Sequence, residues 1–456
     1  MGQAKNFTTS AMTLAVLTAL GGCMGEGLGG DIVSRAGGLV ADGQSFVGGL
    51  MPGAGARERA PDAPALDGEL SNGDRSDTID ALLNRRSVLR DGPYAQVAKA
   101  VLAANSRAAE ADLRAAMLRA EARELNWLPQ LGPSISLTSL GSVVAGLLVE
   151  QTLFDGGANR AAREFARADV EVAAVTLALD TNDRVYQALD LYLTAQAADA
   201  RAAVNSGGMA RMERFEYVMS ERVRAGINDR ADLQLVQQKL TQMRSDLLED
   251  QEAAAAARAE LAAMANGPLD GVTGLSDLGD VVGTAQPLEV MKVAAEGTRG
   301  LAEARALQAG YVPRVTASGT VGQSDSAGLN IGIPNGFGFG RGAERAALEA
   351  MADAADRQVL EQREDSARDV AAIRGRVTSL ARRRANIGTI IEQARANYTL
   401  FEQQLRAGQR TVPEVVGVFR TKLNAEREAV TLTYDLARQE LLLARLYGTL
   451  VDGEDI

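Results

Sequence analysis

The sequence predicts a mainly α-helical fold with small β-hairpins, arranged as a tandem structural repeat. Residues 154–162 align without a gap on residues 339–347, 185 positions later, and the triplet 224–226 aligns on 406–408, 182 positions later. Long stretches without proline are rich in Ala, Leu, Arg, Glu and Gln, which favour helices. Because the matches keep their order and their spacing hardly drifts, an internal repeat explains them better than chance does.

The composition removes most classes of enzyme. The chain of 456 residues has no histidine and one cysteine, which excludes His-based acid–base catalysis, Cys/His zinc sites and internal disulfides. Only 4% of the residues are aromatic, a composition that suits long packed helices. We therefore expect no enzymatic activity and no cofactor. The net charge of −11 also argues against a nucleic-acid partner.

The first 23 residues resemble a bacterial lipoprotein signal. Lys5 precedes a short apolar run at 11–20, and positions 20–23 read Leu-Gly-Gly-Cys. The run is too short for a transmembrane helix, so residues 1–22 are predicted to be a signal peptide. The resemblance implies that Cys23 becomes a lipidated N-terminus. The alternative is an ordinary secretory signal in which this cysteine is incidental.

A Gly/Pro-rich segment follows the signal. Glycines and prolines are frequent from residue 24 to about residue 75, and such a composition cannot build a packed core. Residues 23–90 are therefore predicted to form a lipidated leader.

The first repeat, residues 91–267, is expected to form two helical columns of equal height. Its long helix at 156–224 has 69 residues, or about 100 Å at 1.5 Å per residue. Shorter helices at about 94–127 and 232–265 match that length when laid end to end. Glycines 207 and 208 interrupt the long helix and predict a bend or a break there.

The second repeat, residues 286–450, has the same plan, with a linker at 268–285 before it and a tail at 451–456 after it. In the last helix of the first repeat, apolar residues follow one another at alternating spacings of three and four, as in a coiled coil: Leu233, Val236, Leu240 and Met243. A plain helical bundle would show the same period. The expected helices of the second repeat are 286–311, 342–406 and 414–447.

Each repeat contains a predicted pair of strands, at about 131–154 and 313–338. Apolar residues at 315, 317 and 321 alternate with polar ones, and strands of about ten residues can cross a bilayer in a barrel. A soluble hairpin that caps a bundle is the alternative. Four strands cannot close a barrel, so the membrane interpretation requires an oligomer, and a trimer would supply twelve strands. Five aromatic residues at the strand–helix junctions favour the membrane interpretation: Trp127, Phe154, Tyr311, Phe337 and Phe339.

The repeated plan, with Leu-Phe-Asp-Gly-Gly at 153–157 opening a long helix, resembles the TolC-like outer membrane efflux protein family (outer membrane factors), here of lipoprotein type. The resemblance covers about residues 94–450. It implies a homotrimer in which a 12-stranded β-barrel in the outer membrane continues into a periplasmic tunnel of twelve α-helical columns. It also implies a periplasmic adaptor and an inner-membrane pump as partners, and a lipid-anchored protein in the bacterial outer membrane.

The same resemblance places the periplasmic entrance at the two helix–turn–helix tips, at about 225–231 and 407–413. Gly226 and Gly408 would lie at the contact with the adaptor. Asp232 and Glu414 would face the pore, and Arg410 would join the polar links that close it. Capping is the competing interpretation, because glycine ends helices and acids favour helix N-termini. Two departures from the family pattern, Leu405 and Gly417, stand where some members carry a gate tyrosine and a second pore aspartate.

Three functions are compatible with this sequence. The first is a passive exit duct for small toxic compounds, driven by the inner-membrane pump. The second is the outer-membrane exit channel of a type I protein secretion system, with an ABC exporter as the partner. The third is a structural lipoprotein stalk without a pore, and the strand pairs and junction aromatics argue against it.

Overall fold

The computed structural model describes residues 69–70, 74–104, 108–139, 142–279, 285–322, 325–334, 336 and 340–455. The chain divides into two compact units, 1–62 and 63–456, and all described residues belong to the second unit. The predicted signal peptide, the lipidation at Cys23 and the glycine-rich segment up to residue 68 lie outside the described residues.

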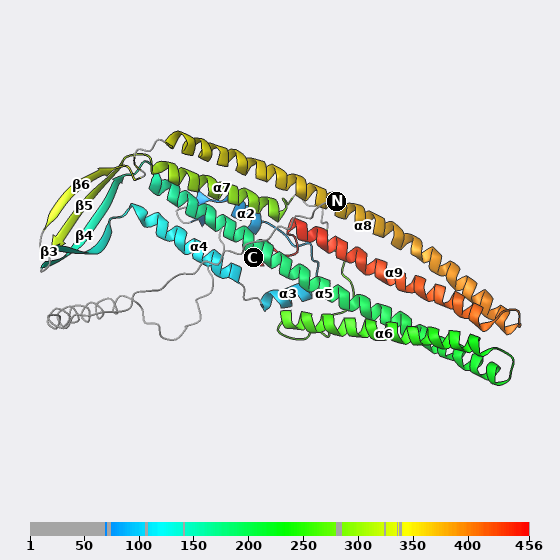
Figure 1. Ribbon diagram of the computed structural model, residues 1–456. Coiled ribbons are helices and arrows are strands. Elements are labelled where there is room, and N and C mark those ends of the chain that lie inside the picture. Colours follow the sequence, from blue (N-terminus) through cyan, green and yellow to red (C-terminus); the bar gives the residue numbers. More distant parts are fainter. Residues whose placement is uncertain are drawn as a thin grey trace, which may run out of the picture. The chain divides into compact units, whose positions relative to one another are not determined.

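Helices make up most of the described residues and follow the predicted repeat (Figure 1). Within each repeat, shorter helices accompany one long helix, and the long helices α5 and α8 have 67 and 66 residues. The helices are α2 (Asp77–Leu83), α3 (Pro93–Ala103), α4 (Ala108–Glu124), α5 (Ala158–Arg224), α6 (Arg230–Met264), α7 (Leu288–Ala309), α8 (Arg341–Arg406) and α9 (Val412–Tyr447). Short 3-10 turns lie at Leu125–Trp127 and Gly453–Asp455, and a small pair of strands, β1 (Glu69–Leu70) and β2 (Asp74–Arg75), precedes α2.

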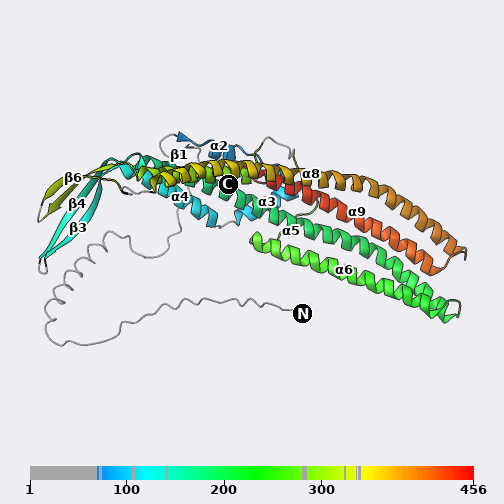
Figure 2. The same cartoon turned by 45° about the horizontal axis from the view of Figure 1, so that its top comes forward.

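The shorter helices lie one after another along the long ones, as their lengths predicted. Helices α3, α4 and α6 pack along α5 (Figure 2). Helices α7 and α9 each pack against both long helices, α5 and α8. Arg184 of α5 lies where two of the short helices end, and it donates to the carbonyls of Val101 in α3 and Met264 in α6. A cation is favourable beside the last carbonyls of a helix. Arg184 therefore ties these two helix ends to the middle of α5.

The first short helix differs from the prediction, because it is divided into α3 and α4 and not continuous over 94–127. The two pieces pack in separate apolar clusters on α5. Val97 and Val101 of α3 join a cluster with Leu189, whereas Leu113 of α4 joins another with Val175. Each piece can thus take the direction that buries its own apolar face, which one straight helix could not do.

The predicted break at glycines 207 and 208 does not occur, since α5 continues from Ala158 to Arg224. Gly208 is buried, and a Cβ atom there would lie 3.0 Å from Leu423 Cδ1 and 3.3 Å from Met243 Cε. Glycine at this position lets α6 and α9 approach α5 closely. Gly207 is exposed and would meet no atom within 4 Å.

The expected leader, 23–90, also ends earlier than predicted, because residues 76–90 pack on the helices. Ile79 and Leu82 of α2 are almost fully buried in the cluster that contains α4 and α5. Arg85 is 5% exposed and donates to the main-chain carbonyls of Gln286, at 2.6 Å, and Tyr447. Burial lowers its pKa to about 10. Arg85 thereby joins the start of α7 to the end of α9.

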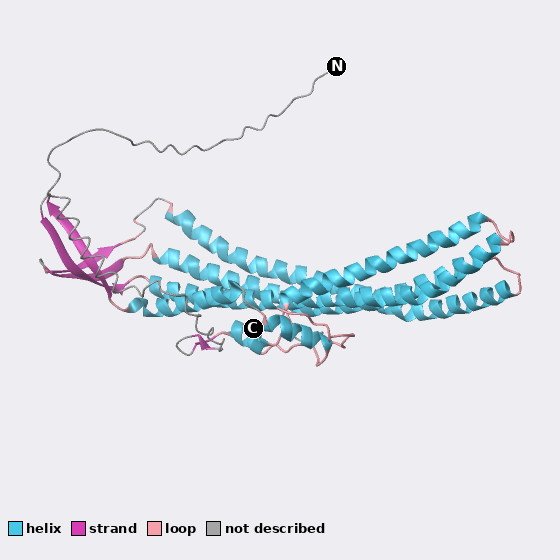
Figure 3. Ribbon diagram, turned by 90° about the horizontal axis from the view of Figure 1, so that it is seen from below, coloured by secondary structure: helices cyan, strands magenta, loops and turns pink. Residues whose placement is uncertain are grey.

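The four long strands form one antiparallel sheet in the order β3 (Gln130–Ser139), β4 (Ser142–Phe154), β5 (Arg314–Gly322) and β6 (Ser326–Gly332). The predicted pairs form, and the central pairing of β4 with β5 joins the two repeats, with Leu147 opposite Val321. Strands β3 and β6 lie at the two edges. The sheet and the turns of the two helical hairpins lie at opposite ends of the helices (Figure 3).

Residues that are paired across neighbouring strands lie on the same face of the sheet. The pairs show that the two faces differ in polarity. On one face Leu147 pairs with Val321, and Ile331 pairs with Val315; the side chain of Ile331 is 74% exposed. The other face is mostly polar, with Glu150 opposite Ser318, Thr316 opposite Asn330 and Thr320 opposite Ser326, although Leu148 also lies on it, opposite Thr320. An exposed apolar face of this kind marks a surface that contacts lipid or protein.

None of the helices in the described part of the chain contains an apolar stretch that is long enough for a membrane crossing.

We predict opposite outcomes for leucine at two adjacent glycines. Gly208→Leu should destabilise the protein by about 1–3 kcal/mol, because the added atoms overpack the contact with Leu423 and Met243. Gly207→Leu is the matched control and should leave stability unchanged or raise it slightly, since leucine favours helices. Thermal unfolding of the purified variants measures the difference, and equal midpoints would refute the packing role of Gly208.

Candidate functional site

The two helical tips are built by the same chain geometry. At the first tip, Gly226 has φ +71° and its N–H donates to the carbonyl of Val223 at 3.0 Å. At the second, Gly408 has φ +73° and donates to Leu405 at 3.0 Å. The left-handed conformation strains any residue with a Cβ atom, so glycine ends both long helices. Both glycines are therefore explained as turn residues. Their contact with an adaptor stays a prediction.

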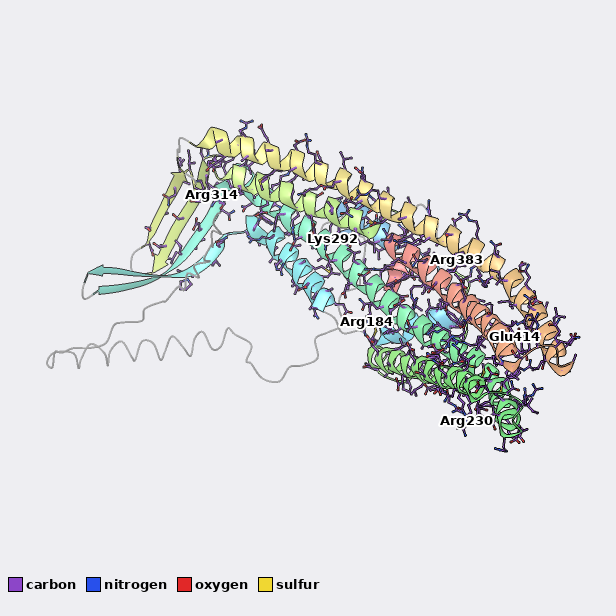
Figure 4. All side chains as sticks on the ribbon, turned by 45° about the vertical axis from the view of Figure 1, so that its right-hand side comes forward. Arg184, Arg230, Lys292, Arg314, Arg383 and Glu414 are labelled. Atoms are coloured by element: carbon purple, nitrogen blue, oxygen red, sulfur yellow. The ribbon has the colours of Figure 1, made fainter. Side chains whose placement is uncertain are left out.

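The acids that follow the tips act as helix-end residues. Asp232 lies in the first turn of α6 and accepts from Asn228 Nδ2 at 3.2 Å. Glu414 forms a capping box with Thr411, accepting from the Thr411 N–H at 2.8 Å and from its hydroxyl at 2.9 Å. These bonds, with the bond from Arg410, hold the pKa of Glu414 below its usual value. Its carboxylate therefore stays charged at the exposed tip (Figure 4).

Arg410 is held by its own hairpin. It donates to Glu414 Oε1 at 2.9 Å and to Gln404 Oε1 at 3.0 Å. Its guanidinium also lies 4.5 Å from the centre of the Phe401 ring. All three partners belong to α8 and α9. Within one protomer these contacts hold Arg410 at the tip, where its side chain is 38% exposed. Its role in closing an entrance stays a prediction.

A buried apolar cluster joins the two hairpins behind the tips. The rings of Phe215 in α5 and Tyr398 in α8 both pack against Phe419 of α9, with centroids 6.1 and 5.4 Å away. Tyr398 is 3% exposed, and Arg211 Nη1 donates to its hydroxyl at 3.0 Å. Burial raises the pKa of Tyr398, and the bond from Arg211 opposes that rise.

Tyr398 is a residue that sequence reasoning missed. It precedes Leu405, the position without the expected gate tyrosine, by seven residues, or about two helical turns. Leu405 itself packs at the edge of the same cluster. The available signal was the scarcity of aromatic residues in the chain, because three of them fall near the second tip, at 398, 401 and 419. Which partner each one meets depends on how the hairpins pack.

A buried charge network lies further from the tips. Asp250 of α6 is 4% exposed and accepts from Arg201 of α5 at 2.8 Å and from Arg427 of α9 at 2.9 Å. A buried carboxylate requires such partners, and removing one of them is costly. Asp250 therefore fixes three helices from both repeats in one register. Sequence analysis did not identify it, because charged residues are frequent along all these helices.

The predicted interface aromatics are described in part. Trp127 is 62% exposed and Phe154 54% exposed, both beside the sheet. Tyr311 is half-buried, and its hydroxyl donates to Glu344 at the start of α8. Phe337 and Phe339 lie outside the described residues. Among the residues that are described, no three metal-binding side chains gather.

Comparison with solved structures finds the same fold in several outer-membrane channels. The chain is similar to the outer membrane protein VceC of Vibrio cholerae, with 16% identity and a TM-score of 0.66 over 78% of this chain and 96% of that one. It is similar to the outer-membrane channel OprN, with 20% identity and a TM-score of 0.66 over 87% and 99%. It is also similar to the CmeC outer membrane channel of Campylobacter jejuni, with 12% identity and a TM-score of 0.67 over 88% and 95%. No protein-family model and no curated sequence matches the chain.

The lowered pKa of Glu414 predicts a pH-dependent contribution to stability. A carboxylate whose pKa is lower in the folded state stabilises the fold above its ordinary pKa, near 4.5. That contribution is lost as the pH falls through the lowered folded value. Glu414→Gln keeps the capping geometry and removes the charge. The difference in thermal midpoint between the wild type and this variant should be greatest near pH 7 and vanish in acid. A difference that persists at pH 2 would contradict this role.

Proposed function

We propose that the chain is one subunit of a homotrimeric outer-membrane channel, the exit duct of a tripartite efflux system. In this role it would pass substrates from an inner-membrane pump and a periplasmic adaptor to the outside. The observation that carries the proposal is a four-stranded sheet with one exposed apolar face, joined directly to two long helical hairpins. No step of this function requires catalysis by the chain.

The edges of the sheet support the trimer. Strands β3 and β6 have no partner on their outer sides within the four-stranded sheet. Unpaired backbone groups are not tolerated in hydrocarbon, so a sheet that contacts lipid must close into a barrel. Pairing of β6 with β3 of the next copy closes it, and three copies give twelve strands. The polar face that carries Glu150 would then line the water-filled interior.

The helical tips supply a surface for the adaptor. Ile227 in the turn of the first tip is 70% exposed, and Tyr217 on the same hairpin is also exposed. Exposed apolar side chains at the end of a hairpin are typical of a contact with another protein. The fold that the chain shares with outer-membrane channels supports the same arrangement. Lipidation of Cys23 would add an anchor in the outer membrane.

Electron microscopy of the detergent-extracted protein tests the channel. We expect particles with three-fold symmetry, a hollow axis and a helical part about 100 Å long. A solid rod, or a monomer that stays folded outside the membrane, would refute the channel and favour a structural stalk.

Single-channel conductance tests the proposed gate. Arg410→Ala should raise the conductance of the trimer in planar bilayers several-fold, because it removes the cation that the tip presents for closing contacts between copies. Arg406→Ala is the matched control, since Arg406 is also an exposed tip arginine, paired with Glu402 on its own helix. The gate assignment fails if the Arg410 variant conducts like the wild type.

A further inference from the structure

A cavity of about 910 Å³ lies where α5, α7 and α8 meet the sheet. Its charged lining consists of Arg160 and Glu164 from α5, Arg305 from α7 and Arg345 from α8. Gly157 and Gly342 also line it, and a Cβ atom at either position would meet no atom within 4 Å. Three separate helices therefore bring their guanidinium groups around one open space.

The charge of this cavity is opposite to that of the whole chain. The lining carries three arginines and one glutamate, whereas the chain has a net charge of −11. Glu164 accepts from Arg160 at 3.1 Å and from Arg305 at 3.2 Å, so one carboxylate holds two cations in place. The remaining arginine, Arg345, pairs with Glu349, which does not line the cavity. Among the lining side chains positive charge is therefore in excess, while Glu349 and Glu344, which accepts from the Tyr311 hydroxyl, lie just outside the lining.

The guanidinium groups retain most of their hydrogen-bonding capacity. Each has five N–H donors in a planar fork, and the bonds to Glu164 use one donor of Arg160 and one of Arg305. The three arginine side chains are largely exposed, and exposed ion pairs contribute little stability and exchange partners easily. An incoming anion can therefore be bound without a large cost to the fold.

The stripe of α5 that contributes Glu164 to the cavity also contacts Ser76. Ser76, just before α2, donates to Glu171 of α5 at 2.6 Å. Glu171 follows Glu164 by seven residues, which is about two helical turns, so both side chains lie along the same stripe of α5. In the proposed channel, a segment that leads to a lipid anchor must run outside the tunnel. The cavity therefore faces the periplasmic surface of the membrane and not the lumen.

The neighbourhood of the cavity is typical of a membrane interface. Tyr311 lines the cavity itself, and the exposed rings of Trp127 and Phe154 lie at the same junction of helices and sheet. Amphipathic rings prefer the level of lipid headgroups. Arginine binds phosphate through two parallel hydrogen bonds, which gives both affinity and orientation.

We propose that this cavity binds the phosphate group of an anionic phospholipid in the leaflet that faces the periplasm. This inference rests on the proposed function, because it needs the junction to lie at the membrane surface. The lipid would bridge α5, α7 and α8 through the three arginines, and its acyl chains would extend toward the apolar face of the sheet. Each trimer would hold one such lipid in each protomer.

Lipid binding by the full-length trimer tests the site. Native mass spectrometry in detergent, with added phosphatidylglycerol, measures the affinity of the wild type and of the triple variant Arg160→Gln, Arg305→Gln, Arg345→Gln. The triple variant should bind the lipid on the order of tenfold more weakly or worse, since charge-assisted hydrogen bonds are lost. The matched control replaces Arg357, Arg368 and Arg383 by glutamine. These are exposed arginines of α8 with exposed ion pairs, and the control should bind like the wild type.

Three results would overturn the proposal. The first is equal affinity of the wild type and the triple variant, and the second is an equal loss in the control, which would indicate a general effect of charge. The third is binding of inorganic phosphate or glycerol 1-phosphate as tightly as the lipid, which would make a soluble anion the ligand. Electron microscopy of the same samples separates this proposal from the function. A wild type that binds the lipid through these arginines but shows no hollow three-fold axis would refute the channel and retain the site.

Discussion

The placement of short helices one after another along two long ones is the constraint on which the rest of the structure depends. Helices α5 and α8 differ by one residue in length, and every shorter helix must end where the next one begins. Buried or half-buried arginines donate hydrogen bonds to the carbonyls at these helix ends. Arg184 binds carbonyls in the last turns of α3 and α6, and Arg85 binds the last carbonyl of α9. Residues 76–90 are therefore part of the packed unit, because Arg85 lies among them.

Ion pairs hold the C-terminal part of α9 to α5, and an apolar cluster surrounds its N-terminal part. Toward its C-terminal end, Arg445 pairs with Asp183 and Arg438 pairs with Asp190, both on α5. The Asp250 network follows, and beyond it Phe419 of α9 packs in an apolar cluster with Tyr398 of α8 and with methionines of α5. Ion pairs fix the register because they are directional, whereas apolar contacts permit small displacements.

The sheet and the cavity beside it are the features that the proposed trimer would complete. The exposed apolar face, with Ile331 and Leu147, has no covering element in the described part of the chain. Its two edge strands can pair with further copies, and the proposed barrel buries both features at once. The arginine-lined cavity lies at the boundary between this sheet and the acidic helices. It would place a lipid headgroup at the level where the exposed Trp127 ring meets the membrane surface.

The sequence alone determined the repeat, the two long helices, both strand pairs and both tips, because proline spacing, alternation and glycine turns are local signals. It also placed Glu414 correctly at a helix start, since a capping box depends on neighbours in the chain. It could not determine the continuity of α5 at Gly208, the division of α3 from α4, or the packing of residues 76–90. Those outcomes depend on which side chains of other helices pack against each position. The Asp250 network, the Arg211–Tyr398 contact and the arginine cavity join residues from different helices, so only the tertiary structure decided them.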